Sequence, residues 1–442
     1  MAGQSSPNHV STKLSRIADL SRARPEMVWT TLSHNIDMEF LQVAFKKTRK
    51  DGAPGVDGRT AREYERDLQG NLEALLNRFK SGTYRAPAVR RVQIPKGKGQ
   101  TRPIGIPTFE DKVLQRAIVM VLNAIYEQDF LECSYGYRPK RSAHQALHTL
   151  REGLMNMWGG YVLELDFEKF FDTLDHGTLR SFLDKRIRDG VIRRTIDKWL
   201  KAGVLEETGQ IQRMKRGTPQ GGVISPLLAN IYLHEVLDLW FHREVQPRLR
   251  GRAFMVRFAD DAVMVFEHEY DAHRVLEVLP KRVGKYGLKL HPEKTRLIRF
   301  RRPPKGGKGK KDTSGHPQTF DLLGFSHYWA ESRQGNWVIL RKTSKGRLSR
   351  ALHEIAIWCK RHRHEAVRAQ HKTLTQKMMG HYQYYGIYGN SRALGAFYKG
   401  VRETWRKWLN RRSNRARMTW ERFAKLSERY VLPNPHIVHY NV

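Results

Sequence analysis

The stretch MVRFADDAVMVF, residues 255–266, places two adjacent acids, Asp260 and Asp261, inside an otherwise apolar run. The segments on both sides are β-prone, so the pattern predicts a hairpin whose tight turn carries both carboxylates at one edge. Adjacent carboxylates repel each other, and each is costly to remove from water. The stretch therefore predicts a positively charged partner at the turn.

A second segment, YVLELDFEKFFDTLDH, residues 161–176, runs a hydrophobic strand directly into Asp166. A single Asp-Asp turn is a weak signal because Asp is common in turns, but three carboxylates at two strand ends are a stronger one. Mg²⁺ prefers oxygen ligands and takes one or two carboxylates together with substrate phosphates. We expect Asp166, Asp260 and Asp261 to hold two Mg²⁺ ions, with Mn²⁺ as a substitute, for an in-line phosphoryl displacement such as nucleotide polymerisation.

The composition favours a polyanionic partner. Lys and Arg number 80 against 44 Asp and Glu, which gives a formal net charge of +36. No apolar run approaches the roughly 20 residues of a membrane span, and the N-terminus lacks the apolar core of a secretory signal. We therefore expect a cytoplasmic protein without a membrane partner. The two cysteines, Cys133 and Cys359, provide neither a disulfide framework nor a paired-cysteine zinc site.

The chain of 442 residues is long enough for two to four domains. Apolar spacing predicts an amphipathic helix over 61–82 and a mostly buried helix over 111–130. Two short strands around a basic glycine turn are expected over 89–107. Residues 301–318, rich in Pro, Gly and Lys, favour a loop between strands. From about residue 345 the pattern becomes helical and strongly basic, so the architecture is mixed α/β first and helical last.

Seven segments resemble the reverse transcriptases, and specifically the group II intron-encoded family, in the order in which that family carries them. They span about residues 84–329 and read IPKGKGQTRPIGIPTFEDKVLQRAI, CSYGYRPKRSAHQAL, LELDFEKFFDTLDH, RGTPQGGVISPLLANIYLHEVLD, RFADDAVMVF, GLKLHPEKTRLIRF and FDLLGFSHYW. The preceding stretch, TLSHNIDMEFLQVAFKKTRKDGAPGVDG, resembles the N-terminal extension of non-retroviral reverse transcriptases. The family usually has Tyr-Ala-Asp-Asp where this chain has Phe258 before Ala-Asp-Asp, so the ring remains while a hydroxyl is missing. We expect activity to survive this change.

The resemblance implies an α+β fold of the right-hand polymerase type, with fingers, a palm whose antiparallel sheet bears the carboxylates, and a helical thumb. Residues 1–83 would form the N-terminal extension and the first part of the fingers, and 84–335 the remaining fingers and the palm. The helical thumb, or maturase domain, would cover 336–405, and 406–442 would be a basic segment expected to contact DNA. Because no paired histidines and cysteines precede Val442, we expect the class that lacks the C-terminal HNH endonuclease domain.

Residue roles carried over from the family fall into three groups. In the first group, Asp166 and Asp260 would bridge the metals, the Phe167 carbonyl would add a ligand and Asp261 would bind or tune the site. The nucleotide-binding group is Lys96, Arg102, Phe171, Gln220 and Gly221. The third group is Lys294, the expected acid that protonates the pyrophosphate leaving group.

Within the nucleotide-binding group, Lys96 and Arg102 would clamp the triphosphate, since Arg offers a planar fork and Lys a point charge. Phe171 would crowd a 2′-hydroxyl and so favour deoxynucleotides. Bland interpretations remain open beside these roles. They are a turn residue for Asp261, a core aromatic for Phe171, a solvated basic hairpin for Lys96 and Arg102, and a surface lysine for Lys294.

In the C-terminal hundred residues, aromatic rings alternate with Arg and Lys at helical spacing. Such a basic face is explained economically by contacts to nucleic-acid phosphates, although many of the rings are also expected to form a helical core. The same reasoning covers basic residues of the CSYGYRPKR segment. The expected RNA- and DNA-binding residues are Arg138, Lys140, Arg141, Arg402, Arg406, Lys407, Arg411 and Arg412.

Together these patterns predict an RNA-directed DNA polymerase that binds structured group II intron RNA, assists its splicing and copies it into cDNA. Its partners would be the intron RNA, a template RNA with a DNA primer, and dNTPs, while protein partners are left open. Two alternatives remain. One is a related polymerase used in cellular defence or repair, and the other is an RNA-binding splicing factor with little polymerase activity.

Overall fold

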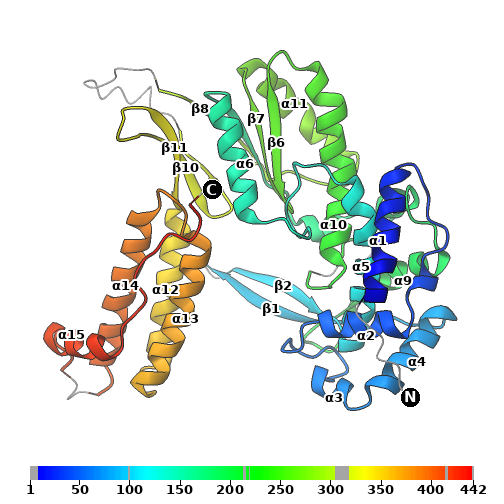
Figure 1. Cartoon of the computed structure of the whole chain (residues 1–442), viewed down its shortest axis with the longest axis horizontal. Coiled ribbons are helices and arrows are strands. Elements are labelled where there is room, and N and C mark those ends of the chain that lie inside the picture. The colour runs from blue at the N-terminus through cyan, green and yellow to red at the C-terminus, as the bar shows by residue number, and fades with distance from the viewer. Residues whose placement is uncertain are drawn as a thin grey trace.

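The computed structural model describes residues 8–97, 100–212, 216–218, 220–303, 318–413 and 417–440. Its fold is of the α+β class, as expected. Figure 1 shows N-terminal helices on one side, a central sheet flanked by helices, and a C-terminal helical bundle on the other side. No described helix combines the length and the apolar character needed to cross a membrane.

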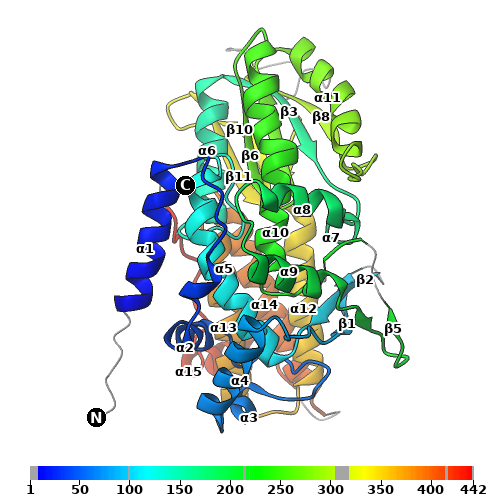
Figure 2. The same cartoon turned by 90° about the vertical axis from the view of Figure 1, so that its right-hand side faces the viewer.

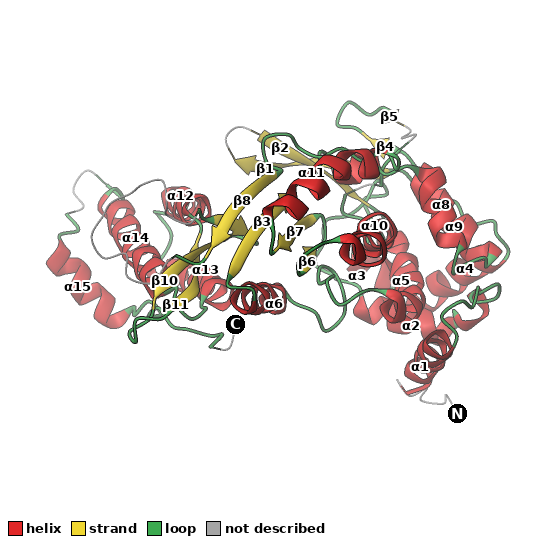
Figure 3. Cartoon of the chain, turned by 90° about the horizontal axis from the view of Figure 1, so that it is seen from above, coloured by secondary structure: helices red, strands yellow, loops and turns green. Residues whose placement is uncertain are grey.

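The central sheet has the strand order β6-β7-β3-β8, and all of its pairings are antiparallel. Because successive side chains of a strand point to opposite faces, this sheet supplies two cores. Val162 and Val263 face one core, together with helix α6, while Leu163 and Met264 face the other, together with α11. The view in Figure 3 shows α6 and α11 on opposite sides of the sheet. The bounds are β3 Gly159–Leu165, β6 Ala253–Phe258, β7 Asp261–Phe266, β8 Arg296–Arg301, α6 Ala143–Asn156 and α11 Glu269–Gly284.

Two smaller sheets adjoin the central one. Strands β9 (Phe320–Leu322), β10 (Phe325–Glu331) and β11 (Trp337–Thr343) form an antiparallel sheet that packs on the α6 side. Strands β1 (Val89–Gly97) and β2 (Gln100–Ile106) form the expected hairpin, which projects as an arm in Figures 1 and 2. The arm continues through β4 (Val204–Leu205) into β5 (Ile211–Gln212). Most of the predicted loop at 301–318 lies outside the described residues.

The N-terminal helices pack around α5 (Phe109–Asp129), which confirms the predicted buried helix. The single helix expected over 61–82 is wrong, because the segment forms α3 (Ala61–Glu65) and α4 (Leu68–Lys80). The cause of the break is Asp67, whose carboxylate accepts a hydrogen bond from the Gly70 amide at 3.3 Å and so starts a new helix. The other N-terminal elements are α1 (Asn8–Ala23), a short 3₁₀ turn (Ser33–Asn35) and α2 (Met38–Lys47).

Between β3 and β6 the described chain is mainly helical, apart from the short strands β4 and β5. Helix α10 is followed by two π-helical segments, in which the backbone hydrogen bonds span five residues instead of four. The bounds are α7 Phe170–Thr173, α8 His176–Asp184, α9 Gly190–Lys201, α10 Ser225–Leu233, the π-helices η2 His234–Asp238 and η3 Phe241–Val245, and the 3₁₀ turn η4 Gln246–Arg248.

The C-terminal part forms a helical bundle with its own core. Its helices are α12 (Lys345–Arg361), α13 (Val367–Tyr385), α14 (Ser391–Asn410) and α15 (Trp420–Arg429). The expected domain limits do not coincide with element ends. The limit at 335/336 separates the paired strands β10 and β11, and the limit at 405/406 falls inside α14.

After α15 the chain returns toward the central sheet. The Val438 amide donates to the Gly386 carbonyl at 2.7 Å, and the His439 ring stacks on His144 of α6 with 3.7 Å between the centroids. This segment, expected as part of a basic tail, therefore joins the bundle to the sheet layer.

Candidate active site

The register of the central sheet brings the predicted carboxylates together. Leu165, the last residue of β3, pairs with Ala262 of β7, so the next residues outward are Asp166 and Asp261. Phe258 pairs with Asp261 across the hairpin, which leaves Ala259 and Asp260 as a two-residue turn. Ala259 has a φ of 58°, in the left-handed region that such a turn requires. The sheet therefore aligns Asp166 with the Asp260-Asp261 hairpin, as predicted.

Two of the three carboxylates open into one pocket of about 390 Å³. Asp166 and Asp261 line this pocket from neighbouring strands, and Glu164 lines it farther along β3. Glu164 is already satisfied, because its carboxylate accepts from Arg296 at 2.6 Å and from the Asp321 amide at 2.9 Å. Glu164 is therefore engaged within the protein, and Asp166 and Asp261, at the ends of β3 and β7, are the two predicted carboxylates that face the pocket.

The electrostatics of the pocket favour an added cation. The surrounding protein raises the pKa of Asp261 to about 6 by desolvation, although its side chain still meets the pocket, and repulsion from Asp260 and Asp166 adds to the effect. Arg347 and Lys294 oppose the increase. Crowded carboxylates of this kind are stabilised by a divalent ion, and Mg²⁺ needs only one or two of them beside phosphates and water. The donor set therefore fits Mg²⁺.

In the described ranges, no three His, Cys, Asp or Glu side chains stand ready as a complete metal centre. A site for Mg²⁺ at Asp166 and Asp261 would therefore need oxygen ligands from the substrate or water to complete its shell.

Lys294 and Arg347 are the cations that face the carboxylates. The Lys294 ammonium lies 3.3 Å from a carboxylate oxygen of Asp166, so this lysine belongs to the pocket and is not an isolated surface residue. Arg347, which the sequence gave no reason to select, reaches the same pocket from the first turn of α12. Only the three-dimensional structure shows that the C-terminal bundle contributes a residue to the carboxylate pocket.

A buried arginine fixes the hairpin that carries Asp260 and Asp261. The side chain of Arg257 is fully buried, and all five of its N–H groups have acceptors, as many as a guanidinium can use. They donate to both Asp238 carboxylate oxygens at 2.7 and 2.6 Å, to Asn230 at 3.0 Å, to Ser134 at 2.8 Å and to the Ala259 carbonyl at 3.0 Å. The last bond holds the turn that carries Asp260.

The charge of Arg257 is balanced inside the protein. Burial raises the pKa of Asp238, but attraction and hydrogen bonding to Arg257 outweigh it and keep the pKa below its ordinary value. Asp238 comes from the π-helix η2, which lies far from the hairpin in sequence. The backbone also closes tightly here, since a side chain at Gly136 would meet the Ala259 amide nitrogen at 2.2 Å.

Phe167 and Phe171 occupy different environments. Phe167 bridges to Leu290, with the His291 amide donating to the Asp166 carbonyl and the Glu168 amide to the Lys289 carbonyl, both at 2.8–2.9 Å. The Phe167 carbonyl takes no part in this pair of bonds. Phe171 is 6% exposed and packs in the main core, as its bland interpretation held, and its carbonyl accepts from the Thr218 amide at 2.8 Å.

Three of the predicted nucleotide-binding residues, Arg102, Gln220 and Gly221, meet at the arm. The Arg102 Nε donates to the Gln220 side chain at 2.5 Å, and the Gly105 amide donates to the Gln220 carbonyl at 2.6 Å. Gly221 has a φ of 115°, and a side chain there would meet the Gly105 carbonyl oxygen at 2.6 Å. Glycine is therefore required where these segments cross. The side chain of Lys96 lies outside the described residues.

Tyr137 is a further residue at this site. Its ring is 58% exposed, and its φ is 59°. Burial and the charges of Asp260 and Asp261 raise the pKa of its hydroxyl, whereas Arg102 lowers it. Tyr137 follows Gly136, which packs against the Ala259 backbone, so Tyr137 neighbours the hairpin that carries the carboxylates.

The expected nucleic-acid contacts divide into internal and exposed residues. Arg138 is wrong as an RNA contact, because it is 7% exposed, pairs with Glu127 at 3.1 Å and donates to the Leu131 and Ser134 carbonyls. Arg141 pairs with Glu132, whereas Lys140 is exposed.

The same division holds along α14. Arg406 donates to the Met418 carbonyl at 3.0 Å and lies 4.1 Å from the Trp420 ring, and Arg412 donates to the carbonyls of Arg363 and Glu365. Arg402 lies 5.6 Å from the Tyr398 ring. Lys407 and Arg411 are exposed beside Trp408.

Comparison with known proteins places this site in a family. The profile described as reverse transcriptase (RNA-dependent DNA polymerase) matches residues 94–327, which contain Asp166, Asp260 and Asp261. The chain belongs to the reverse transcriptase family.

The individual relatives indicate a more specific group within this family. The chain is 32% identical over 283 residues to the group II intron-encoded protein LtrA of Lactococcus lactis subsp. cremoris, covering 61% of this chain and 46% of that protein. It is 38% identical over 203 residues to the protein YkfC of Escherichia coli (strain K12), covering 45% and 52%, respectively. With nuclear intron maturase 2, mitochondrial, of Arabidopsis thaliana it shares 26% identity over 179 residues, 32% of this chain and 24% of that one. The chain spans about half the length of the first two. The resemblance to group II intron-encoded reverse transcriptases is confirmed.

Proposed function

We propose that this protein is an RNA-directed DNA polymerase that binds a group II intron RNA, assists its splicing and copies it into cDNA. The observation that carries the proposal is the sheet register, since Asp166 and Asp261 end paired strands at one pocket beside a turn that presents Asp260. Membership in the reverse transcriptase family supports it, as do the names of the relatives.

In this proposal the central sheet is the palm, the β1–β2 arm with the N-terminal helices forms the fingers, and α12–α14 form the thumb. Arg347 supports the last assignment, because it brings the first turn of α12 to the carboxylate pocket. A thumb in this position would close over a duplex whose end lies at Asp260.

The chemistry would use the carboxylates as metal ligands. Two Mg²⁺ ions bound by Asp166, Asp260 and Asp261 would stabilise the attacking and leaving oxygens of nucleotidyl transfer. The Phe167 carbonyl, which the local strand bridge does not use, would be a further ligand. Lys294, whose ammonium lies 3.3 Å from Asp166, would protonate the pyrophosphate leaving group.

The nucleotide would lie between the arm and the carboxylates. Arg102, held by Gln220, would meet the triphosphate together with Lys96, and Gly221 would let the backbone approach the base pair. Phe171, at the start of α7, would crowd a 2′-hydroxyl of the incoming nucleotide. The hydrogen bond from the Thr218 amide to its carbonyl would hold it in this position. Exposed cations, including Lys140, Lys407 and Arg411, would contact RNA phosphates.

Primer extension on an RNA template with Mg²⁺ and dNTPs tests the proposal. Wild-type protein should extend the primer, and Asp260→Ala should reduce the rate by about 1,000-fold or more, because a metal ligand contributes several kcal/mol to the transition state. The matched control is Glu277→Ala, which removes an exposed carboxylate from α11 and should leave synthesis unchanged. Equal synthesis by wild type and Asp260→Ala would overturn the assignment.

A second measurement addresses the RNA. Asp260→Ala should bind the intron RNA that flanks its gene as tightly as wild type and should still accelerate its splicing, because Lys407 and Arg411 lie at the end of α14, outside the residues that line the carboxylate pocket. Loss of splicing with the loss of synthesis would instead tie both activities to one site.

A further inference from the structure

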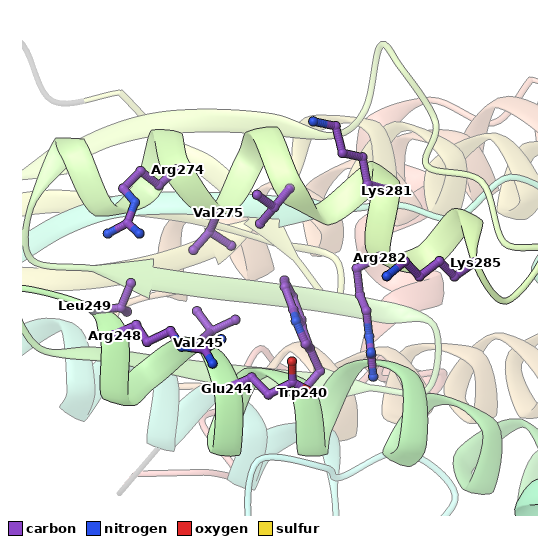
Figure 4. A pocket seen from close by; sticks show the side chains of 11 residues that line it. Trp240, Glu244, Val245, Arg248, Leu249, Arg274, Val275, Lys281, Arg282 and Lys285 are labelled. Carbon is purple, nitrogen blue, oxygen red and sulfur yellow. The ribbon is translucent and has the colours of Figure 1, made fainter.

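A groove on the opposite side of the sheet from the carboxylates is the strongest unassigned feature. It has a volume of about 340 Å³ and lies between α11 and the helical segment that runs from Trp240 to Leu249 (Figure 4). α11 packs on the sheet face of Leu163 and Met264, whereas Asp166 and Asp261 follow the alternation of Glu164 and Val263 on the other face. The groove and the carboxylate pocket are therefore two separate sites.

The groove has an apolar floor and a cationic rim. Val245, Leu249, Val275 and the largely buried Trp240 form the floor, and Val278, which is 43% exposed, extends it. Five cations line it from both walls, as Figure 4 shows: Arg248, Arg274, Lys281, Arg282 and Lys285. Among the described residues that line the groove, Glu244 is the one carboxylate. The charge is complementary to a polyanion with an apolar part.

The spacing of the cations suits a chain of phosphates better than one small anion. Arg274, Lys281 and Lys285 follow one side of α11, and eleven residues at 1.5 Å each extend over about 16 Å. Arg282 is held in place from the facing segment, since its guanidinium donates to the Val236 carbonyl at 3.0 Å and to the Glu235 carbonyl at 3.3 Å. At least one cation of the set is thus fixed before any ligand arrives.

An exposed aromatic ring beside the groove points to nucleic acid. Tyr270, at the start of α11, is 51% exposed, and two guanidinium groups lie near its ring, with Arg250 at 4.3 Å and Arg274 at 5.5 Å from the ring centroid. Stacked rings and guanidinium planes are the surfaces on which single-stranded bases bind. An acidic protein segment would use the cations but would have no need for this ring. A second copy of the chain, at +36, would be repelled.

We propose that the α11 groove, defined by the residues above together with Tyr270, binds a single-stranded segment of RNA. Its phosphates lie along Arg248, Arg274, Lys281 and Lys285, and one base stacks on Tyr270. Because the groove lies across the sheet from the carboxylates, the bound segment is not the stretch being copied. The protein can then hold one part of an RNA while the polymerase site works on another.

Charge reversal with a matched control tests the groove. The variant Arg248→Glu/Arg274→Glu/Lys281→Glu changes three exposed cations from both walls. The control, Arg188→Glu/Arg194→Glu/Lys201→Glu, changes the same residue types by the same charge at and near α9. Binding of a fluorescent 20-nucleotide RNA without self-complementarity is followed by anisotropy over a range of salt concentrations.

The groove variant should lose at least about tenfold in affinity and about 2 in the slope of log K against log salt, since each lost phosphate contact lowers the slope by roughly 0.7 for single strands. The control should change affinity by less than about threefold. Equal losses in both variants would mean diffuse attraction and would overturn the proposal. Melting temperatures and primer extension by both variants, expected near wild type, show that the fold and the carboxylate site are intact.

Variants of Tyr270 distinguish an RNA ligand from an acidic protein ligand. Tyr270→Ala should weaken RNA binding by about fivefold or more, whereas Tyr270→Phe, which keeps the ring, should bind like wild type. A 4-thiouridine RNA should crosslink within α11. If Tyr270→Ala binds RNA normally while the groove variant loses binding of a poly-glutamate peptide, the groove is a protein-docking site and the RNA assignment is wrong.

Discussion

The carboxylate site and the C-terminal bundle use the same kinds of residue in opposite ways. At the carboxylate site, charged groups are fixed by partners inside the protein: Arg257 uses all five donors and Asp166 is held by Lys294. In the bundle, rings form the core while cations such as Lys407 and Arg411 remain at the surface. We infer that catalysis at the carboxylate site depends on charged groups held in a fixed geometry, whereas RNA binding by the bundle depends on cations that remain at the surface. The same substitution should therefore have different consequences in the two regions.

The largest effect is expected from Asp166→Asn. It keeps the shape of the side chain but removes the charge that faces Asp261, so primer extension should fall by about 1,000-fold or more. RNA binding measured by anisotropy should stay within about twofold of wild type, because the carboxylate repels phosphates and contributes no attraction. Loss of RNA binding with intact folding would show that the two regions are not separable.

Arg257→Met should be the most damaging change for stability. It leaves Asp238 buried without its partner, which costs about 3–5 kcal/mol in the free energy of unfolding. The double variant Arg257→Met/Asp238→Leu replaces the pair by apolar groups and should recover most of that loss. Chemical denaturation measures both variants.

The double variant also separates the effect of Arg257 on the position of the hairpin from its effect on stability. It still lacks the hydrogen bond to the Ala259 carbonyl, so kcat for nucleotide addition should remain at least about tenfold low while the KM for dNTP changes little. Recovery of both stability and kcat would mean that Arg257 acts through the fold alone.

The next largest effect is expected in the pH dependence of primer extension. Without a cation, the folded pKa of Asp261 is about 6, above its ordinary 3.8. The folded state therefore binds this proton more tightly, and the contribution of Asp261 to stability is full below pH 3.8 and is lost as the pH rises through about 6. At limiting Mg²⁺, primer extension should rise with pH through about 6, and saturating Mg²⁺ should shift this midpoint to lower pH because cation and proton compete. A midpoint independent of Mg²⁺ would remove Asp261 from the metal site.

The smallest effects are expected in the bundle. Lys407→Ala/Arg411→Ala should weaken RNA binding severalfold and lower the salt slope by about 1.5, with an unchanged melting temperature, because both side chains are exposed. Arg406→Met is the contrasting variant. Arg406 lies over Trp420, so its loss should cost about 1 kcal/mol of stability with little change in the salt slope. Equal behaviour of the two variants would contradict the division between internal and exposed cations.

Local patterns predicted the elements of the site well. The apolar runs around Asp260 and before Asp166 identified the three strands β6, β7 and β3, and the basic glycine turn identified the arm. The break at Asp67 was missed because a helix N-cap inside a periodic pattern looks like another polar position on the exposed face. The prediction for Arg138 failed for a similar reason. The sequence does not distinguish an arginine that pairs with Glu127 inside the protein from one that contacts RNA.

By itself the sequence determined the strands, the hairpin turn, the three carboxylates, the excess of positive charge and the family, because these depend on spacing along the chain. Only the tertiary structure decided which charges are satisfied. It brought Asp238 and Ser134 to Arg257, Arg347 to the carboxylates, and cations of two separate segments to one groove. The reason is physical: the energy of a charge depends on its desolvation and its neighbours, and both are set by residues that are remote in sequence.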